Sequence, residues 1–334
     1  MPKVFVTRKI PEDGLKLLQG QVDLEVWEED RAIPREVLLE KVKGVDAILS
    51  LLTDKIDGEV MDAAGPQLKI ISNYAVGFDN VDVAAATQRK IFVTNTPGVL
   101  TEAVAEHAVA FLLALARRVV ESDRFTREGK YAGWEPMLLL GPEVKDKTLG
   151  IVGLGRIGSR VAEMAVKGLL MKVVYYDVKP NPEFEAQFGA VYKDIETLLR
   201  ESDFVTIHVP LLPETRHLIN AEKLALMKKT AYLINTSRGP IVDEAALVAA
   251  LKNGTIAGAA LDVYENEPAL APGLAELPNV ILTPHTASAT FEARGAMSTL
   301  AAQAILDVFS GKIPQNLVNA VLAGGSVAIS NERK

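Results

Sequence analysis

Short apolar runs alternate with helical patterns along almost the whole chain, and this alternation constrains the fold more than any other feature of the sequence. The first hundred residues contain five runs rich in β-branched residues, with amphipathic stretches such as 36–42 and 81–87 between them. Strands that alternate with helices form parallel sheets covered on both faces. The five strand-like runs are 4–7, 24–27, 47–51, 68–72 and 91–94.

The same alternation resumes after a loop at 133–142 and predicts a second doubly wound domain. A final helical pattern at 291–309 has no strands of its own, so we expect it to return to the first domain. The 334 residues are then expected to form a first domain over 1–99 and 287–320, an inserted domain over 100–286, and a polar tail over 321–334. Strand-like runs of the second series are 148–152, 172–176, 204–209, 231–235, 256–261 and 280–282, with helical patterns at 157–167, 195–200, 221–227 and 244–252.

Composition excludes several classes of function. The chain has 36 basic and 43 acidic residues, a net charge of −7, and lacks a run of lysines or arginines, so we expect neither a nucleic-acid nor a membrane-surface partner. It has no cysteine, which excludes disulfides, thiolate metal sites and cysteine nucleophiles, and we expect no metal site. No leader is visible and no apolar run reaches the roughly 18 residues of a membrane span. The protein is expected to be cytoplasmic.

Three glycines directly after the run 148–152 have the spacing of a dinucleotide-binding loop. Gly153 permits a tight turn, Gly155 lets the backbone approach a pyrophosphate, and Gly158 allows close packing of helix and strand. This context predicts a Rossmann-type domain over 100–286, inserted in a flavodoxin-like substrate-binding domain.

An acidic residue ends the next strand-like run, 19 residues after the last glycine of the loop. A carboxylate at Asp177 can accept both hydroxyls of the adenosine ribose and repels a 2′-phosphate. We therefore expect NAD(H) to be preferred. Lys179 and the lack of an arginine directly after Asp177 leave use of NADP(H) open.

Three charged residues follow strand-like runs of the second domain, where doubly wound sheets place their ligands. Reduction of a 2-keto acid needs a cation for the carboxylate, polarisation of the keto oxygen and a proton donor with a pKa near 7. Arg238 supplies a cation, His285 is one of only four histidines, and Glu267 is a carboxylate that can orient it.

The ordered set of segments 150–159, 204–211, 233–243, 259–268 and 283–285 resembles the D-isomer-specific 2-hydroxyacid dehydrogenase family over nearly the whole chain. The resemblance implies that Arg238 binds substrate and polarises its carbonyl, that Glu267 is the partner of the histidine, and that His285 is the acid–base. It also implies that the backbone amides of Val76 and Gly77 hold the substrate carboxylate.

The same resemblance implies the positions that bind the cofactor. They comprise the glycine loop with the first residues of its helix, a residue near the nicotinamide, residues that line the adenosine side, and one that contacts the carboxamide. The expected set is Thr101, Gly153, Gly155, Arg156, Ile157, Gly158, Asp177, His208, Pro210, Thr215, Thr236, Asp262 and His285.

Within the family, the segments 73–80 and 133–136 look most like those of glyoxylate/hydroxypyruvate reductases, and Trp134 is expected to contact substrate. Phosphite dehydrogenases usually have lysine where Val76 stands, and formate dehydrogenases have glutamine at the position of Glu267. Phosphoglycerate and phosphite dehydrogenases remain alternatives, as does a non-catalytic NAD-sensing corepressor of the same fold.

A nearly apolar helical pattern and the loop after it predict a homodimer. Residues 103–116 contain only Glu106 and His107 as clearly polar side chains, too few for a helix on the surface of a monomer. The apolar arm that follows carries Tyr131, Trp134, Met137, Leu138, Leu139 and Leu140. A two-fold dimer is the commonest arrangement that buries such a surface, and family members are usually dimers.

Overall fold

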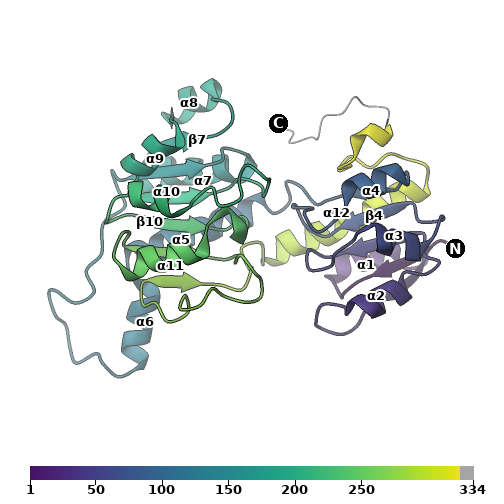
Figure 1. The fold of residues 1–334 in the computed structure, drawn as a ribbon, viewed down its shortest axis with the longest axis horizontal. Coiled ribbons are helices and arrows are strands. Elements are labelled where there is room, and N and C mark those ends of the chain that lie inside the picture. Colours follow the sequence, from purple (N-terminus) through teal and green to yellow (C-terminus); the bar gives the residue numbers. More distant parts are fainter. Residues whose placement is uncertain (324–334) are drawn as a thin grey trace. The chain divides into compact units, whose positions relative to one another are not determined.

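The computed structural model describes residues 1–323 as two compact α/β units (Figure 1). Within the described residues, unit 1 consists of 1–100 and 289–323, and unit 2 consists of 101–288. Of the expected polar tail, 321–323 belong to a short 3₁₀ helix over Ala320–Ala323, and 324–334 lie outside the described residues.

Unit 1 is built on a five-stranded parallel sheet in the order β2-β1-β3-β4-β5, the flavodoxin-like order expected from the sequence. Helices α2, α3 and α4 pack on one face, while α12 contacts α1, β3 and β4. The elements of unit 1 are β1 (Lys3–Val6), α1 (Glu12–Leu18), β2 (Asp23–Val26), α2 (Arg35–Lys41), β3 (Ala47–Ser50), α3 (Gly58–Ala64), β4 (Ile70–Asn73), α4 (Val83–Gln88), β5 (Phe92–Thr94) and α12 (Phe291–Phe309).

Unit 2 is built on a seven-stranded parallel sheet in the order β12-β11-β10-β9-β6-β7-β8. Counted from β6, this is the Rossmann order with one further strand, and the fold class predicted from the sequence is confirmed. Its elements are α5 (Thr101–Ala116), α6 (Val119–Arg127), β6 (Thr148–Val152), α7 (Arg156–Leu169), β7 (Lys172–Tyr176), α8 (Pro182–Phe188), β8 (Val191–Tyr192), α9 (Ile195–Glu201), β9 (Phe204–Ile207), α10 (Ala221–Leu226), β10 (Tyr232–Asn235), α11 (Glu244–Lys252), β11 (Gly258–Leu261) and β12 (Val280–Leu282).

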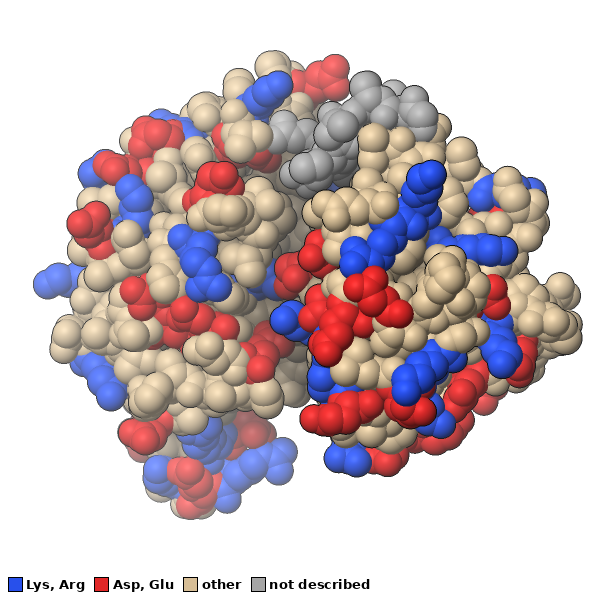
Figure 2. All heavy atoms as spheres, turned by 45° about the vertical axis from the view of Figure 1, so that its right-hand side comes forward, with Lys and Arg blue, Asp and Glu red and all other residues tan. Residues whose placement is uncertain are grey.

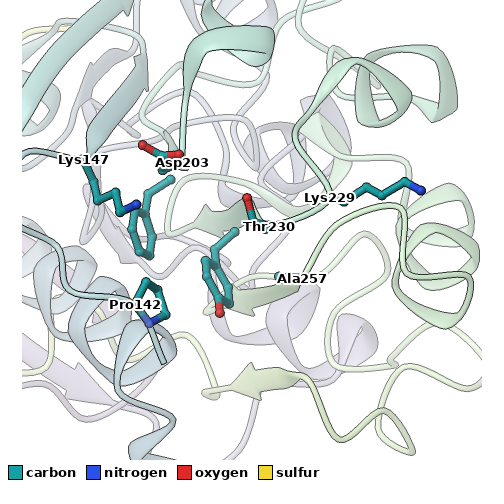
Figure 3. Close-up of a pocket in the computed structure, with 8 residues that line it drawn as sticks. Pro142, Lys147, Asp203, Lys229, Thr230 and Ala257 are labelled. Atoms are coloured by element: carbon teal, nitrogen blue, oxygen red, sulfur yellow. The ribbon is translucent and has the colours of Figure 1, made fainter. Parts of the chain in front are cut away.

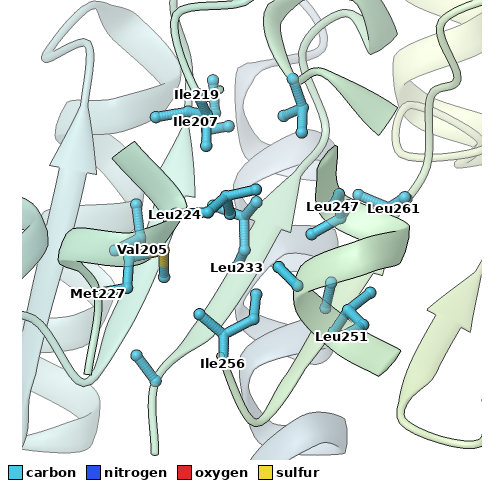
Figure 4. Packing of buried hydrophobic residues seen from close by; sticks show 14 of the residues in the cluster. Val205, Ile207, Ile219, Leu224, Met227, Leu233, Leu247, Leu251, Ile256 and Leu261 are labelled. Atoms are coloured by element: carbon cyan, nitrogen blue, oxygen red, sulfur yellow. The ribbon is translucent and has the colours of Figure 1, made fainter. Parts of the chain in front are cut away.

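Two apolar clusters cover the two faces of the sheet in unit 2. On one face, Leu233 of β10 and Leu261 of β11 meet Leu224 of α10 and Leu247 of α11 (Figure 4). On the other face, α5 and α7 pack over the alternate strand residues. Both faces of each central strand are therefore apolar, which is why these strands occur in the sequence as continuous hydrophobic runs.

Short helices account for most of the elements that the hydrophobic pattern did not reveal. Helices α1, α3 and α8 have seven residues each, so their 3.6-residue period is short and easily missed, although α2 and α9 of the same length were predicted. Side-chain caps nevertheless mark two of them, since Asp57 accepts a hydrogen bond from the Val60 amide and Asn181 accepts one from the Phe184 amide. Strand β8 has only two residues, both exposed at the edge of the sheet.

Helix α5, the apolar helix behind the dimer prediction, is half-buried within one chain. Eight of its residues are buried, and six of these, including Ala105, Phe111 and Leu112, belong to an apolar cluster of unit 2, where α5 packs against α7, β10 and β11. Of its apolar residues, 109, 113 and 114 are only partly buried and 110 is exposed. The part that this helix plays in a dimer therefore stays a prediction. Although α5 is so apolar, no helix within residues 1–323 is long and apolar enough to cross a membrane.

Basic and acidic side chains are interspersed over the face of the molecule that Figure 2 shows. Some of the charged side chains form surface ion pairs, for example Arg89 and Asp62, whose Nε and Oδ1 atoms lie 2.7 Å apart. Exposed ion pairs contribute only about 0–1 kcal/mol each. The buried clusters, not these pairs, are therefore the main source of stability.

Candidate active site

The glycine loop joins β6 to α7 and has the close packing that a pyrophosphate site requires. Gly153 has a φ of +97°, and a Cβ there would lie 2.8 Å from the carbonyl carbon of His208. A Cβ on Gly158 would lie 2.0 Å from the Gly153 oxygen, so only glycine fits. By contrast, nothing lies within 4 Å of a Cβ built on Gly155. The N-terminus of α7 therefore opens onto free space.

Arg156 and Ile157 begin α7, where the first backbone amides of a helix have no acceptor within the helix. These amides carry the positive end of the helix dipole, which favours a bound phosphate. The loop and the helix N-terminus fit a dinucleotide.

Asp177 follows β7 and lies beside the glycine loop, as a ribose-binding carboxylate must. One carboxylate oxygen accepts a hydrogen bond from the Leu154 amide at 2.9 Å, and the other accepts one from the Val178 amide at 2.6 Å. The side chain is half-buried. The carboxylate thus also holds the loop in place.

The residues predicted for the adenosine side follow β9, next to β6 in the sheet. The ring Nε2 of His208 lies 2.9 Å from the Thr206 hydroxyl, and burial lowers the pKa of His208 to about 3, so the ring is neutral. The Thr215 hydroxyl accepts a hydrogen bond from the Leu212 amide and donates one to the Pro210 carbonyl. This segment is therefore a closed turn whose shape is set by its own bonds.

His285 lies in a turn after β12, in a backbone conformation that non-glycine residues rarely adopt. Its φ is +55°, and its amide hydrogen-bonds to the carbonyls of Asp262 and Thr283 at 2.9 and 3.1 Å. The fully buried Asp262 carboxylate accepts hydrogen bonds from the Thr286 and Ala287 amides at 2.7 Å each. Asp262 therefore fixes the backbone that presents His285. Conformations of this kind concentrate at functional sites.

Glu267 orients the His285 ring. Its Oε2 lies 2.9 Å from Nδ1 of His285, and its Oε1 accepts a hydrogen bond from the Tyr264 amide at 3.0 Å. Burial tends to raise the pKa of Glu267, but the hydrogen bonds from His285 and Tyr264 and the charges of His285 and Arg238 lower it overall. Within residues 1–323, Nε2 of His285 has no partner, so this nitrogen is left to act on a substrate.

Arg238 follows β10, and its charge is near enough to Glu267 to lower the pKa of that carboxyl. Its Nη1 donates a hydrogen bond to the Ser237 carbonyl at 2.9 Å. Arg238, Glu267 and His285 follow β10, β11 and β12, which are adjacent in the sheet. Parallel strands bring their carboxyl ends to one edge, so the fold gathers the three predicted catalytic residues there.

Three other predicted cofactor positions have different surroundings. The Thr236 hydroxyl is buried and has no hydrogen-bond partner within residues 1–323, as expected for a group that binds a ligand. Thr101 is the first residue of α5. Asp262 exposes no surface at all, so its observed role is to hold the His285 turn, and its contact with a carboxamide stays a prediction.

The carboxylate-binding loop predicted in unit 1 directly follows β4. Asn95 donates a hydrogen bond to the Val76 carbonyl at 2.8 Å, and Asn73 donates one to the Gly77 carbonyl at 3.0 Å. The amides of Val76 and Gly77 have no acceptor among the described residues. Two adjacent free amides form the kind of concavity that binds anions.

Residues 109–287 match the model of the D-isomer specific 2-hydroxyacid dehydrogenase NAD-binding domain. The chain is 54% identical over 322 residues to the glyoxylate reductase of Thermococcus litoralis, with 95% of this chain and 97% of that one covered. The chain belongs to the D-isomer specific 2-hydroxyacid dehydrogenases. The resemblance found in the sequence is thereby confirmed.

Solved structures of this dehydrogenase family match the fold closely. A glyoxylate reductase from Paecilomyes thermophila has a TM-score of 0.85 and 32% identity, covering 96% of this chain and 99% of that one. The NADPH-dependent glyoxylate/hydroxypyruvate reductase of Sinorhizobium meliloti, solved with NADP and malonate, has a TM-score of 0.82 and 35% identity, covering 95% and 97%. The dehydrogenase therefore carries an NAD(P)-binding domain.

Tyr264 is a residue of this dehydrogenase site that the sequence analysis missed. Besides holding Glu267 through its amide, it donates a hydrogen bond from its hydroxyl to the Thr283 carbonyl at 2.8 Å. It therefore ties the Glu267 segment to the His285 segment. Its position three residues before Glu267 was the available signal, but an apolar aromatic beside a strand indicates packing in most sequences.

The other histidines of the dehydrogenase do not join the His285–Glu267 pair. His107 of α5 is half-buried, with Nε2 at 3.3 Å from the Thr283 hydroxyl, as expected for a helix histidine with one hydrogen bond. His217 follows Arg216 in the connection between β9 and α10. It is only partly exposed and lies 2.6 Å from Oε1 of Glu265.

A cavity of about 310 Å³ in unit 2 lies away from the site (Figure 3). Its lining includes Lys147, Asp203 and Thr230, which precede β6, β9 and β10. These are the amino ends of the strands, whereas the predicted catalytic residues follow the carboxyl ends. We therefore do not place substrate in this cavity.

Proposed function

We propose that the protein reduces glyoxylate or hydroxypyruvate to the corresponding 2-hydroxy acid, with the D configuration where the product is chiral, and that NADH is the preferred hydride donor. The observation that carries this proposal is the His285–Glu267 pair, 2.9 Å apart, beside Arg238 at adjacent strand ends. The names of the relatives, glyoxylate reductases at more than 50% identity, support the choice of substrate. We also propose that the protein is cytoplasmic.

The mechanism that we propose follows from the hydrogen bond between His285 and Glu267. The nicotinamide, when bound, supplies hydride to the carbonyl carbon. Because Nδ1 of His285 is held by Glu267, Nε2 carries the proton that passes to the keto oxygen. Glu267 stabilises the protonated ring, and the guanidinium of Arg238 binds the carboxylate and polarises the carbonyl. We assign the remaining contacts of the substrate carboxylate to the amides of Val76 and Gly77.

The activity is tested by following NADH consumption with glyoxylate, hydroxypyruvate, pyruvate and 3-phosphohydroxypyruvate. We expect the first two to be reduced fastest, because the relatives are named glyoxylate reductases and the proposed site offers one cation and two amides to a single carboxylate, with no further cation for a phosphate. Faster reduction of the phosphorylated acid would favour a phosphoglycerate dehydrogenase, and oxidation of phosphite with NAD would favour a phosphite dehydrogenase. Tight NADH binding without turnover on any acid would contradict an enzyme and favour a corepressor.

The same assay with NADPH tests the role of Asp177. We expect a higher kcat/KM with NADH, because the carboxylate beside the glycine loop repels a 2′-phosphate. The NADPH-dependent relative from Sinorhizobium meliloti is the reason to measure both cofactors. A preference for NADPH in the wild-type protein would show that this interpretation of Asp177 is wrong.

We also propose a homodimer that buries the arm, residues 131–140. Within this chain Trp134, Met137 and Leu140 are 82%, 76% and 57% exposed. Figure 1 shows the segment after α6 leaving the body of unit 2 as an extended loop. An exposed set of large apolar side chains marks an interaction surface. Trp134 is proposed to contact substrate from this arm.

Light scattering at micromolar concentration is expected to give about twice the 36.0 kDa chain mass. The change Leu140→Asp should shift this toward the monomer, because it places a charge in the interface. Leu170→Asp is the matched control, because Leu170 is also 57% exposed but lies outside the arm. A monomer mass for the wild-type protein, or equal effects of the two variants, would contradict the proposal.

A further inference from the structure

Glu244 is a buried carboxylate that the proposed mechanism does not use. It is the first residue of α11, directly after the N-cap Asp243, and is only 3% exposed. Its Oε1 accepts a hydrogen bond from the Glu265 amide at 2.5 Å, and its Oε2 accepts one from the Ala271 amide at 3.3 Å. In return, the Glu244 amide donates to the Glu265 carboxylate at 3.4 Å. One side chain therefore holds two points of the segment 265–271.

The segment that Glu244 holds carries Glu267, the partner of His285. This segment belongs to the long connection between β11 and β12, which has no helix or strand of its own. Few backbone bonds fix such a connection, so its shape depends on side chains that reach it. Glu244 contacts it on both sides of Glu267.

The same region also joins the segment of Arg238. A Cβ on Gly239 would lie 1.9 Å from the carbonyl carbon of Tyr264, so the backbones after β10 and β11 are in direct contact there. Gly239 follows Arg238, and Glu244 lies five residues further along the same segment. The segment that carries Arg238 and the segment that carries Glu267 therefore contact each other twice. Their backbones pack together at Gly239, and Glu244 joins them by hydrogen bonds.

Burial of a carboxylate in this position is costly. Burial raises the pKa of Glu244, and the charges of Glu265 and Glu267 raise it further, while the bonds from the two amides lower it. A neutral side chain would avoid the unfavourable charge, but only a carboxylate offers acceptors to two amides without adding a donor. The hydrogen bonds from the Glu265 and Ala271 amides therefore explain why a carboxylate occupies this buried position.

We propose that Glu244 is a positioning residue for the proton-transfer pair: by binding the Glu265 and Ala271 amides, it holds Glu267 where Glu267 can orient His285. The proposal rests on the proposed reductase activity. It assigns to Glu244 no contact with substrate or cofactor.

The first test is the kinetics of Glu244→Gln in the full-length protein. A glutamine places an N–H donor against one of the two amides, so we expect kcat for glyoxylate to fall about 10–100-fold while KM and the Kd for NADH change less than about twofold. Glu244→Asp keeps the charge but is one methylene shorter, and we expect a similar loss. The matched control is Glu276→Gln, which removes an exposed carboxylate from the same connection and should retain the wild-type rate.

A double mutant separates positioning from a merely structural role. If Glu244 acts through Glu267, the effect of Glu244→Gln should shrink to less than about twofold in a protein that already carries Glu267→Gln. Losses that multiply in the double mutant would overturn the proposal, and so would an unchanged kcat in both Glu244 variants.

Hydrogen exchange keeps the proposal testable without activity. The amides of residues 265–271 should exchange about tenfold faster or more in Glu244→Gln, with no change in peptides from unit 1. Unchanged exchange in this segment would overturn the role of Glu244. A wild-type protein that reduces none of the acids would instead refute the proposed function, so the two failures are distinguishable.

Discussion

Replacement of His285 by Gln is expected to lower kcat for glyoxylate reduction by about 10²–10⁴-fold, the contribution typical of a general acid. The variant loses the proton donor at Nε2 but leaves the glycine loop and Asp177 untouched. Fluorescence titration should therefore give an almost unchanged Kd for NADH. Steady-state rates with saturating NADH and glyoxylate measure the loss.

The chain offers a matched control in its other histidine–glutamate pair. His217 lies 2.6 Å from Glu265, a geometry similar to that of His285 and Glu267, but it follows no strand of the sheet directly. We expect His217→Gln to keep a rate near that of the wild type. If His285→Gln retains more than half of the wild-type turnover, His285 has no part in proton transfer.

The fold was predictable from the sequence because its central strands are buried on both faces. Runs such as 148–152 and 172–176 are apolar at every position that the two clusters cover, and their bounds agree with β6 and β7. Helix α12, at 291–309, was also predicted with its exact bounds, because its length allows a clear pattern. Helices α1, α3 and α8 showed no such pattern, although Asp57 and Asn181 cap two of them.

The candidate site was predictable only in part, for a different physical reason. His285, Glu267 and Arg238 follow strands, and parallel strands bring such positions to one edge of the sheet. The residues that hold them, Tyr264 and Glu244, act through contacts between segments that are distant in sequence. No period or spacing in a sequence indicates which backbone amide a buried carboxylate will bind. The contacts of Tyr264 and Glu244 are therefore visible only in the folded structure.

Helix α5 shows where a hydrophobic pattern stops being informative. An almost entirely apolar helix indicates burial, but the sequence does not indicate which surface covers it. Here α7, β10 and β11 cover one side of it within the chain, and residues such as 110 stay exposed. The arm at 131–140, whose side chains are exposed, is the stronger argument for a second subunit.

The change Arg238→Lys is expected to lower kcat/KM for glyoxylate by about 10–10²-fold, with KM raised and kcat lowered together. Lysine keeps the positive charge but loses the planar fork, and with it one charge-assisted hydrogen bond worth about 1.5–3 kcal/mol. Both constants should change because a carboxylate contact persists from the bound substrate to the transition state, while polarisation of the carbonyl is felt only in the transition state. Arg216→Lys is the control, since Arg216 is 56% exposed and lies 3.8 Å from Glu265. Kinetics of Arg238→Lys that match this control would mean that Arg238 serves the fold and does not bind the substrate.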